Sequence, residues 1–175
     1  MREKLTPEQQ RRIDFFLEDG WVHLDDDEEG DDEISAANLS RLLKEIEVPE
    51  EIHLMIAGFN WDGGGDEISL LIDHSKCDVA SVLLAYWRSG PRYFCQYSSE
   101  EEIRKYQRES WLLVQRLHAA VVDRLGDDSS IGFDPRCDDT FNEYDWTADY
   151  AENEVEGGLY AIPEAFFRPI VQSGN

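Results

Sequence analysis

The sequence predicts a mainly α fold: a compact bundle of about six or seven helices with a small irregular or β-hairpin C-terminal region. Through the first 125 residues, apolar side chains recur at spacings of three and four, which is typical of the buried face of a helix. Capping residues or prolines precede several of these stretches. The 175 residues suit one domain, which can bury roughly 70% of its unfolded surface. We divide this single domain into residues 1–34 (a helix and an acidic loop), 35–97 (short helices), 98–126 (a long helix) and 127–175 (an acidic, aromatic-rich region and a closing helix).

The N-terminal part combines a capped helix with a run of acids. Thr6, Pro7 and Gln9 supply an N-cap, a proline at the first helical position and a capping-box partner, so a helix is expected to begin there. Residues 25–33 then place eight acids around Gly30. Mutual repulsion between these acids favours an exposed loop.

Short helices are expected between residues 35 and 97, because apolar residues at helical spacing are separated by breakers. The predicted helices are Ser35–Glu47, Pro49–Gly58, Glu67–His74 and a helix that is capped by Asp78, or by Ser75 slightly earlier, and ends before Gly90. A longer helix is expected over Glu100–Leu125, because Ser99 and Glu102 have the spacing of a capping box.

The composition changes after this helix. Residues 127–156 hold eleven acids and one base, Arg136, interleaved with aromatic residues. We expect irregular structure here, with a short strand pair between residues 131–133 and 159–162. A closing helix is predicted over residues 163–171.

The charge balance restricts the class of partner. Asp and Glu number 39 and Lys and Arg 16, giving a formal net charge of -23 and a pI near 4.3. Proteins that bind nucleic acid through its phosphates need clustered positive charge, so we expect no nucleic-acid partner. With 41% hydrophobic residues the chain is expected to be folded rather than disordered.

The protein is expected to be cytoplasmic and to have no membrane partner. It is expected to be a monomer or a homodimer. It begins with a charged helix, and no run of 18 apolar residues occurs. Its three cysteines, Cys77, Cys95 and Cys137, include no C-x-x-C pair, which favours reduced thiols.

Neither a metal nor another cofactor is expected. Residues 25–30 carry acids at positions 1, 3 and 5 and glycine at position 6 of a calcium loop, but Ala36 stands where the bidentate Glu is needed. His74 and Cys77 have a spacing that zinc can use, yet His53 and the other cysteines make no second close pair. No catalytic residue is assigned.

One segment carries a family resemblance. It contains Phe59-Asn60-Trp61-Asp62-Gly63, then His74-Ser75-Lys76-Cys77-Asp78, and a helix ending in Tyr86-Trp87 before Gly90-Pro91. Over Leu39–Tyr97 the chain resembles the bacterial family named domain of unknown function 4274. The resemblance implies no established activity, although such domains are similar to small accessory proteins encoded near polymorphic toxins. The motif residues are Asn60, Trp61, Asp62, His74, Cys77 and Asp78.

These motif residues have two readings. In the structural reading, Trp61 fills the space between helices, Cys77 behaves as a small buried hydrophobe and Asp78 caps its helix. In the functional reading, four of them converge as a polar site. Those four are Asn60, Asp62, His74 and Asp78.

The leading functional hypothesis is an acidic binding protein that inhibits a basic protein partner, most concretely an immunity protein that neutralises a cognate bacterial toxin. Negative charge attracts a cationic partner quickly, and aromatic side chains supply buried contact. The expected partner-binding residues are Asp25, Asp27, Glu29, Tyr144, Asp145, Trp146 and Asp149.

Three alternatives stay open. The aromatic residues of 127–156 can instead turn inward to the core, leaving an ordinary soluble surface. The chain can be a hydrolase or metal-dependent enzyme that uses the Asn60–Asp78 region. A nucleic-acid mimic would need evenly spaced carboxylates along one face, and the acid clusters here are uneven.

Overall fold

The computed structural model describes residues 1–18, 32–61, 65–148 and 155–173, with the side chains of 32–36 excluded. These residues form a mainly α fold with seven α-helices and no sheet, which confirms the predicted fold class. No helix in this part of the chain combines the length and the apolar character that crossing a membrane requires. The α-helices are α1 (Pro7–Leu17), α2 (Asp32–Lys44), α3 (Pro49–Gly58), α4 (Asp66–Asp73), α5 (Val79–Arg88), α6 (Pro91–Phe94) and α7 (Arg108–Arg124).

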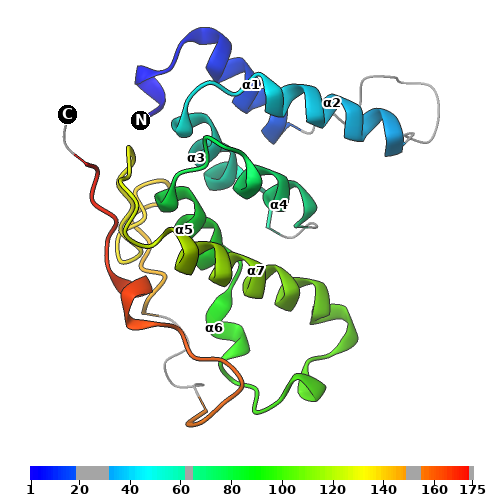
Figure 1. The fold of residues 1–175 in the computed structure, drawn as a ribbon, viewed down its shortest axis with the longest axis vertical. Helices are drawn as coiled ribbons and strands as arrows, with labels where there is room; N and C mark the ends of the chain where they lie inside the picture. The colour runs from blue at the N-terminus through cyan, green and yellow to red at the C-terminus, as the bar shows by residue number, and fades with distance from the viewer. Residues whose placement is uncertain (19–31, 62–64, 149–154, 174–175) are drawn as a thin grey trace.

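The helices stack in three tiers, with α1 beside α2, α3 beside α4, and α5 beside α7 (Figure 1). α5 is the central element, because it packs against α7, α3 and α4, while α3 also packs against α1. The chain after α7 runs in irregular segments past the ends of these helices (Figure 1).

Capping side chains fix where α1 and α3 begin. Thr6 Oγ1 accepts a hydrogen bond from Gln9 N at 3.3 Å, and Gln9 Oε1 accepts one from Thr6 N at 2.9 Å, as the sequence predicted. Buried Glu51 accepts the N–H of Glu47 at 3.0 Å and also pairs with Arg12 of α1 at 2.7 Å. One carboxylate therefore closes the start of α3 and ties that helix to α1.

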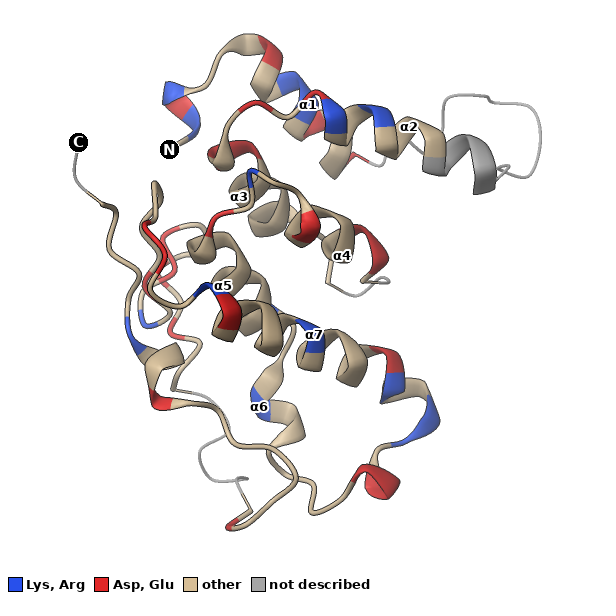
Figure 2. Cartoon of the chain, viewed as in Figure 1, with Lys and Arg blue, Asp and Glu red and all other residues tan. Residues whose placement is uncertain are grey.

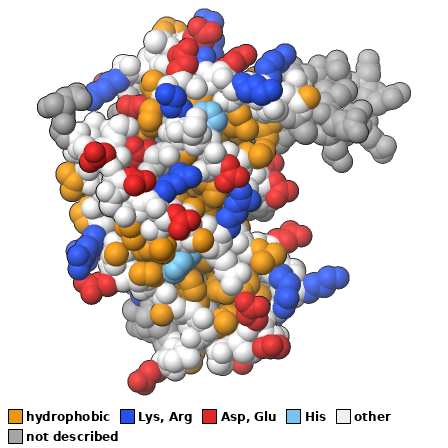
Figure 3. Space-filling model, viewed as in Figure 1, with side chains coloured by type: hydrophobic (Ala, Val, Ile, Leu, Met, Phe, Trp, Pro, Cys, Tyr) orange, Lys and Arg blue, Asp and Glu red, His pale blue; other side chains and the backbone are white. Residues whose placement is uncertain are grey.

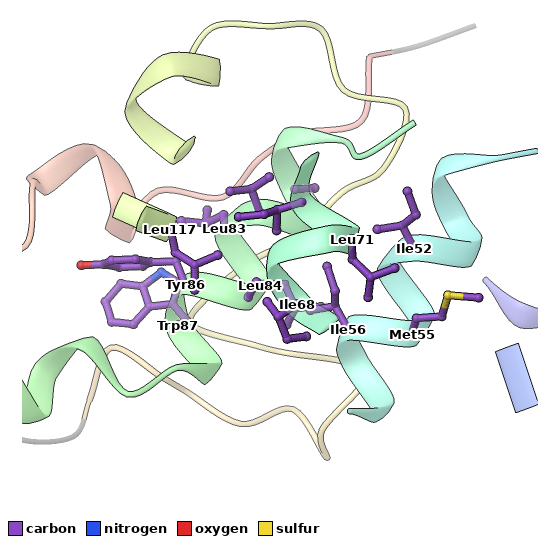
Figure 4. Close-up of a cluster of buried hydrophobic side chains, with 14 of the residues drawn as sticks. Ile52, Met55, Ile56, Ile68, Leu71, Leu83, Leu84, Tyr86, Trp87 and Leu117 are labelled. Atoms are coloured by element: carbon purple, nitrogen blue, oxygen red, sulfur yellow. The ribbon is translucent and has the colours of Figure 1, made fainter. Parts of the chain in front are cut away.

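The apolar core lies between the tiers (Figure 4). α3 contributes Ile52 and Ile56, α4 contributes Leu71, and α5 contributes Leu83 and Leu84, all of them fully buried. Each such side chain stabilises the fold by roughly 1.5–3 kcal/mol relative to its exposed state. All ten residues of α5 are buried, so this helix has no solvent-facing side.

The predicted long helix is shorter than the sequence indicated. It begins at Arg108 rather than near Glu100, because Ile103 and Arg104 are extended, with ψ of 118° and 149°. Gln107 Oε1 accepts the Arg104 N–H at 3.2 Å and the Tyr97 hydroxyl at 3.1 Å. These bonds to a single side chain hold the turn before α7 in a non-helical path.

The capping box expected at the start of that helix is replaced by another contact. Glu102 accepts the backbone N–H of Ser98 at 2.8 Å, and Ser99 makes no cap bond of its own. Two 3₁₀ turns, Glu100–Glu102 and Lys105–Gln107, occupy the stretch instead. Tyr106, in the second of these turns, is 72% exposed.

The C-terminal region is irregular in the described residues, and its pairing differs from the expected one. Phe133 exchanges backbone hydrogen bonds with Ile170 at 3.0 and 2.8 Å, rather than with residues 159–162. The closing helix is reduced to a 3₁₀ turn at Glu164–Phe167. Pro169 lies inside the predicted helix, and it both lacks an N–H and keeps Arg168 extended.

Candidate functional site

Most of the described acid- and aromatic-rich stretch predicted as a recognition surface is a compact loop, residues 134–148, which we call the anchored loop. Asp138 N donates to Tyr144 O at 2.9 Å, and Phe141 N donates to Asp138 O at 3.0 Å. Trp146 N donates to Pro135 O at 2.9 Å. These bonds fold the segment on itself without a regular strand.

A buried ion pair ties the anchored loop to α5. Arg88 Nη2 lies 2.9 Å from Asp138 Oδ2, and the two side chains are only 4% and 0% exposed. Arg88 also donates to the Ala57 carbonyl at the end of α3 and to Thr140 Oγ1. The guanidinium therefore joins α5, α3 and the loop at one point.

Asp138 is held as a carboxylate although it is buried. Burial opposes its ionisation, but hydrogen bonds from Thr140, Trp146 and Arg88 outweigh burial and lower its pKa. The Trp146 indole N–H donates to Asp138 Oδ2 at 2.9 Å. An ion pair inside a low-dielectric region is stable only when its remaining hydrogen-bonding sites are also filled, which is the case here.

Three aromatic rings of the loop form a cluster above this ion pair. Tyr144 and Trp146 lie 4.6 Å apart between ring centroids, and Phe141 lies 5.6 Å from Trp146. The Arg88 guanidinium carbon is 5.2 Å from the Phe141 ring centre and 5.6 Å from that of Trp146, within range of a cation–π contact. Phe141 is 47% exposed, so one ring of the cluster reaches solvent.

The tip of the loop is strained. Asn142 and Glu143 have φ of 54° and 57°, in the left-handed region that residues other than glycine seldom adopt. Two such residues in succession cost roughly 1–3 kcal/mol each and persist only where surrounding contacts hold them. Strain of this kind gathers at functional positions, which makes the tip a candidate contact point.

Carboxylates that the ion pair does not use lie near Cys137 in the same loop. Asp139 and Glu143 are exposed, and Asp134 is half-buried. Partial desolvation, followed by Glu143, Asp134 and Asp139, raises the pKa of the exposed Cys137 thiol, so these acids lie close together. Figure 2 shows the acid-rich segments of this region beside the ends of α3 and α5.

The partner-binding residues expected from the sequence divide into three groups. Tyr144 and Trp146 lie in the aromatic cluster and are only half exposed, with Trp146 bonded inward to Asp138. Asp145 accepts the N–H and hydroxyl of Thr147 at 2.8 and 2.6 Å, which orders the turn. The remaining four lie outside the described residues: Asp25, Asp27, Glu29 and Asp149.

Asp78 of the family motif has a defined structural role. Its carboxylate caps α5 by accepting the Ala80 N–H at 3.0 Å, and it also accepts hydrogen bonds from Ser129 and Ser130. Burial raises the pKa of the neighbouring Cys77 thiol to about 11, which keeps it protonated. Both observations agree with the structural reading of these two residues.

The other motif residues are spread along α4. His74 follows its C-terminus, where its Nδ1 accepts the Lys76 N–H at 3.1 Å. Trp61 and Asn60 precede its N-terminus, and Asp62 lies outside the described residues. An eight-residue helix spans about 12 Å, so α4 separates Trp61 from His74 and Asp78.

His53, a sequence candidate for zinc, is a core residue. Its Nδ1 lies 3.1 Å from Ser81 Oγ, and burial lowers its pKa to about 4, so the ring is neutral. Among the residues that the structure describes, no three His, Cys, Asp or Glu side chains are grouped closely enough to hold a metal ion.

Sequence reasoning missed Arg88 and Asp138, which organise the candidate site. The one local signal was a basic residue closing an otherwise apolar helix, because a buried cation requires an acid partner. Which of 39 acids supplies that partner has no local signature.

A family comparison supports the resemblance inferred from the sequence. Residues 47–121, from just before α3 through most of α7, match the family described as Domain of unknown function (DUF4274). The resemblance predicted over Leu39–Tyr97 is therefore confirmed, with a match that starts later and reaches further. No match was found among curated proteins or among solved structures. The anchored loop lies outside the matched residues.

Proposed function

We propose that this protein is an acidic binding protein that inhibits a basic protein partner, most concretely an immunity protein that neutralises a cognate bacterial toxin. The observation that carries the proposal is the anchored loop: a rigid, strained loop that exposes Asp139, Phe141 and Glu143 above a buried ion pair. The net charge of -23 supplies the long-range attraction.

Charge alone does not select a binding face. On the face drawn in Figure 3, acidic, basic and hydrophobic side chains are interspersed. The anchored loop differs in kind, since Arg136 is its one base and two of its five carboxylates, those of Asp139 and Glu143, are exposed. We therefore place the first contact with a cationic partner at the loop, where Glu143 meets its basic groups.

The rigidity of the loop favours affinity. Association costs about 0.5–1.5 kcal/mol for each flexible side chain that it immobilises. The hydrogen bonds around Asp138 already fix the loop before a partner arrives. Phe141, half exposed beside Tyr144 and Trp146, supplies the apolar contact that acids lack.

The test uses the protein encoded by the gene next to this one. Its binding to the purified chain is measured calorimetrically at 50 and 300 mM salt, and its toxicity is measured in cells that express the chain. We expect binding that weakens with salt, together with protected growth. The double variant Asp139→Lys/Glu143→Lys should bind at least about tenfold more weakly, because like charges then face each other.

A matched control changes the total charge by the same amount on a different element. The control is the double variant Glu3→Lys/Glu18→Lys. Glu3 precedes α1 and Glu18 is its C-cap, and both are exposed. This variant should change the affinity for the partner by less than about twofold. Absence of binding and of protection with the unmodified chain would refute the proposed function. Equal weakening by the two double variants would refute the placement at the loop.

A further inference from the structure

A second feature is a cavity of about 450 Å³ between the start of α4, the end of α5 and the first turns of α7, with Arg88 in its lining. We call it the Trp61 cavity. All of its lining residues fall between positions 61 and 116, inside the family-matched span. The first turns of α4 and α7, both carrying acids, lie on the same side of the molecule (Figure 2). Its volume is in the range of ligand-binding sites.

The charges around the cavity favour a cation. Its two guanidiniums, Arg88 and Arg116, are neutralised by Asp138 and Asp73. Two further carboxylates line the cavity and form no ion pair with any described residue, so the region keeps an excess of negative charge. These carboxylates belong to Asp66 and Glu109.

Trp61 gives the cavity an aromatic wall with an unused donor. Its ring packs edge-on against Phe59, with centroids 5.5 Å apart. Its indole N–H is buried and makes no hydrogen bond to the described residues, which costs about 1–3 kcal/mol. Leu113 lines the same cavity, and Leu112, 58% exposed, adds apolar surface.

We propose that the Trp61 cavity receives an arginine or lysine side chain of a basic protein partner. Glu109 and Asp66 attract the cationic group, Trp61 binds it through its ring face, and Leu113 contacts the methylene stem. Trp is the best aromatic residue for contact with a cation. This inference rests on the proposed function, because the side chain belongs to the partner that the anchored loop attracts.

Small probes test the cavity without the partner. N-acetyl-arginine amide and its neutral analogue N-acetyl-citrulline amide are titrated while the indole resonances of the tryptophans are followed by NMR. Trp61→Phe identifies the Trp61 signal. We expect a saturable shift of that signal with the arginine probe and at least about tenfold weaker binding of the citrulline probe. An unmoved Trp61 signal, or equal binding of both probes, overturns the inference.

A charge variant completes the test. Glu109→Gln should weaken the arginine probe roughly fivefold or more, whereas Glu3→Gln, remote from the cavity, should leave its affinity unchanged. Because Glu109 lies in the first turn of α7 and favours the helix dipole, the thermal midpoint of each variant is measured as well. If Glu109→Gln does not fold, Asp66→Asn takes its place.

The two proposals fail in different ways. If the neighbouring gene product binds the unmodified chain but Glu109→Gln and Trp61→Phe bind it equally well, the cavity inference is wrong and the proposed function stands. If the arginine probe binds and the gene product does not, the proposed function is wrong, and the cavity keeps its affinity for cations but loses its assignment to that partner.

Discussion

The helical core and the anchored loop are held by different forces, and they meet at one residue. The core packs apolar side chains such as Leu84 against neighbouring helices, and such burial is non-directional. The loop is anchored by the Arg88–Asp138 ion pair, and the strength of that pair depends on its geometry and on the charge state of both side chains. Since Arg88 is the last residue of the wholly buried α5, the core supplies the fixed point from which the loop is displayed.

The largest expected effect comes from breaking that junction. Arg88→Met keeps the apolar stem but leaves the buried Asp138 carboxylate without its cation, which should lower the free energy of unfolding by about 3–5 kcal/mol. Urea unfolding at pH 7 measures the loss. Arg116→Met is the control, because the Arg116–Asp73 pair is exposed and should contribute no more than about 1 kcal/mol. Equal losses in the two variants would contradict the difference drawn between buried and surface pairs.

The second largest effect concerns the core, whose stability should depend on pH because it contains the buried His53. His53 has a pKa of about 4, below the usual 6.5, because of burial, while Asp138 and Asp78 partly oppose that shift. Between these values the unfolded chain binds more protons than the folded chain. Stability should therefore fall as the pH drops from about 6.5 to about 4, by about 3 kcal/mol. The free energy of unfolding at pH 7, 5.5 and 4.5 measures this slope.

A variant that cannot titrate isolates the histidine. His53→Gln keeps a polar group for Ser81, and its stability should vary less with pH over that window. The slope that remains should reflect His118, whose pKa burial also lowers. A variant with the full slope of the unmodified chain would show that His53 does not cause the pH dependence.

The smallest effect concerns the strained tip. Glu143→Gly removes the penalty of φ 57° and should raise stability by about 0.5–1 kcal/mol, after the greater chain entropy of glycine is subtracted. Asp139→Gly removes the same charge from the same loop where φ is not positive, so it should lower stability instead. Thermal unfolding compares the two. A stabilised Glu143→Gly that also loses partner affinity would mean that the tip trades stability for binding.

Local signals predicted the elements that local interactions determine. The predicted helix Pro49–Gly58 matches α3, and Asp78, one of the two caps predicted for the next helix, is the N-cap of α5. The start of α7 was misjudged because Gln107 bonds to Tyr97, a contact that no capping pattern encodes. A helix boundary is predictable when its cap lies within a few residues.

The candidate site was harder to predict for the same reason. Arg88 and Asp138 are 50 residues apart, and only the folded chain selects that acid among 39. The acid and aromatic composition of residues 127–156 pointed to the stretch that contains the anchored loop. It could not show that Trp146 bonds inward while Phe141 and Glu143 face solvent.

The position of Phe166 has a consequence for synthesis on the ribosome. Its ring is fully buried against Tyr86 at 4.9 Å, and its carbonyl accepts the Trp87 indole N–H across 79 residues of sequence. Translation proceeds at about 5–20 residues per second, so Phe166 is added to the nascent chain roughly 4–16 s after Trp87. During that interval α5 has been translated, but Tyr86 and Trp87 at its C-terminal end lack their contacts with Phe166. We therefore expect chaperones to bind the nascent chain mainly in this interval.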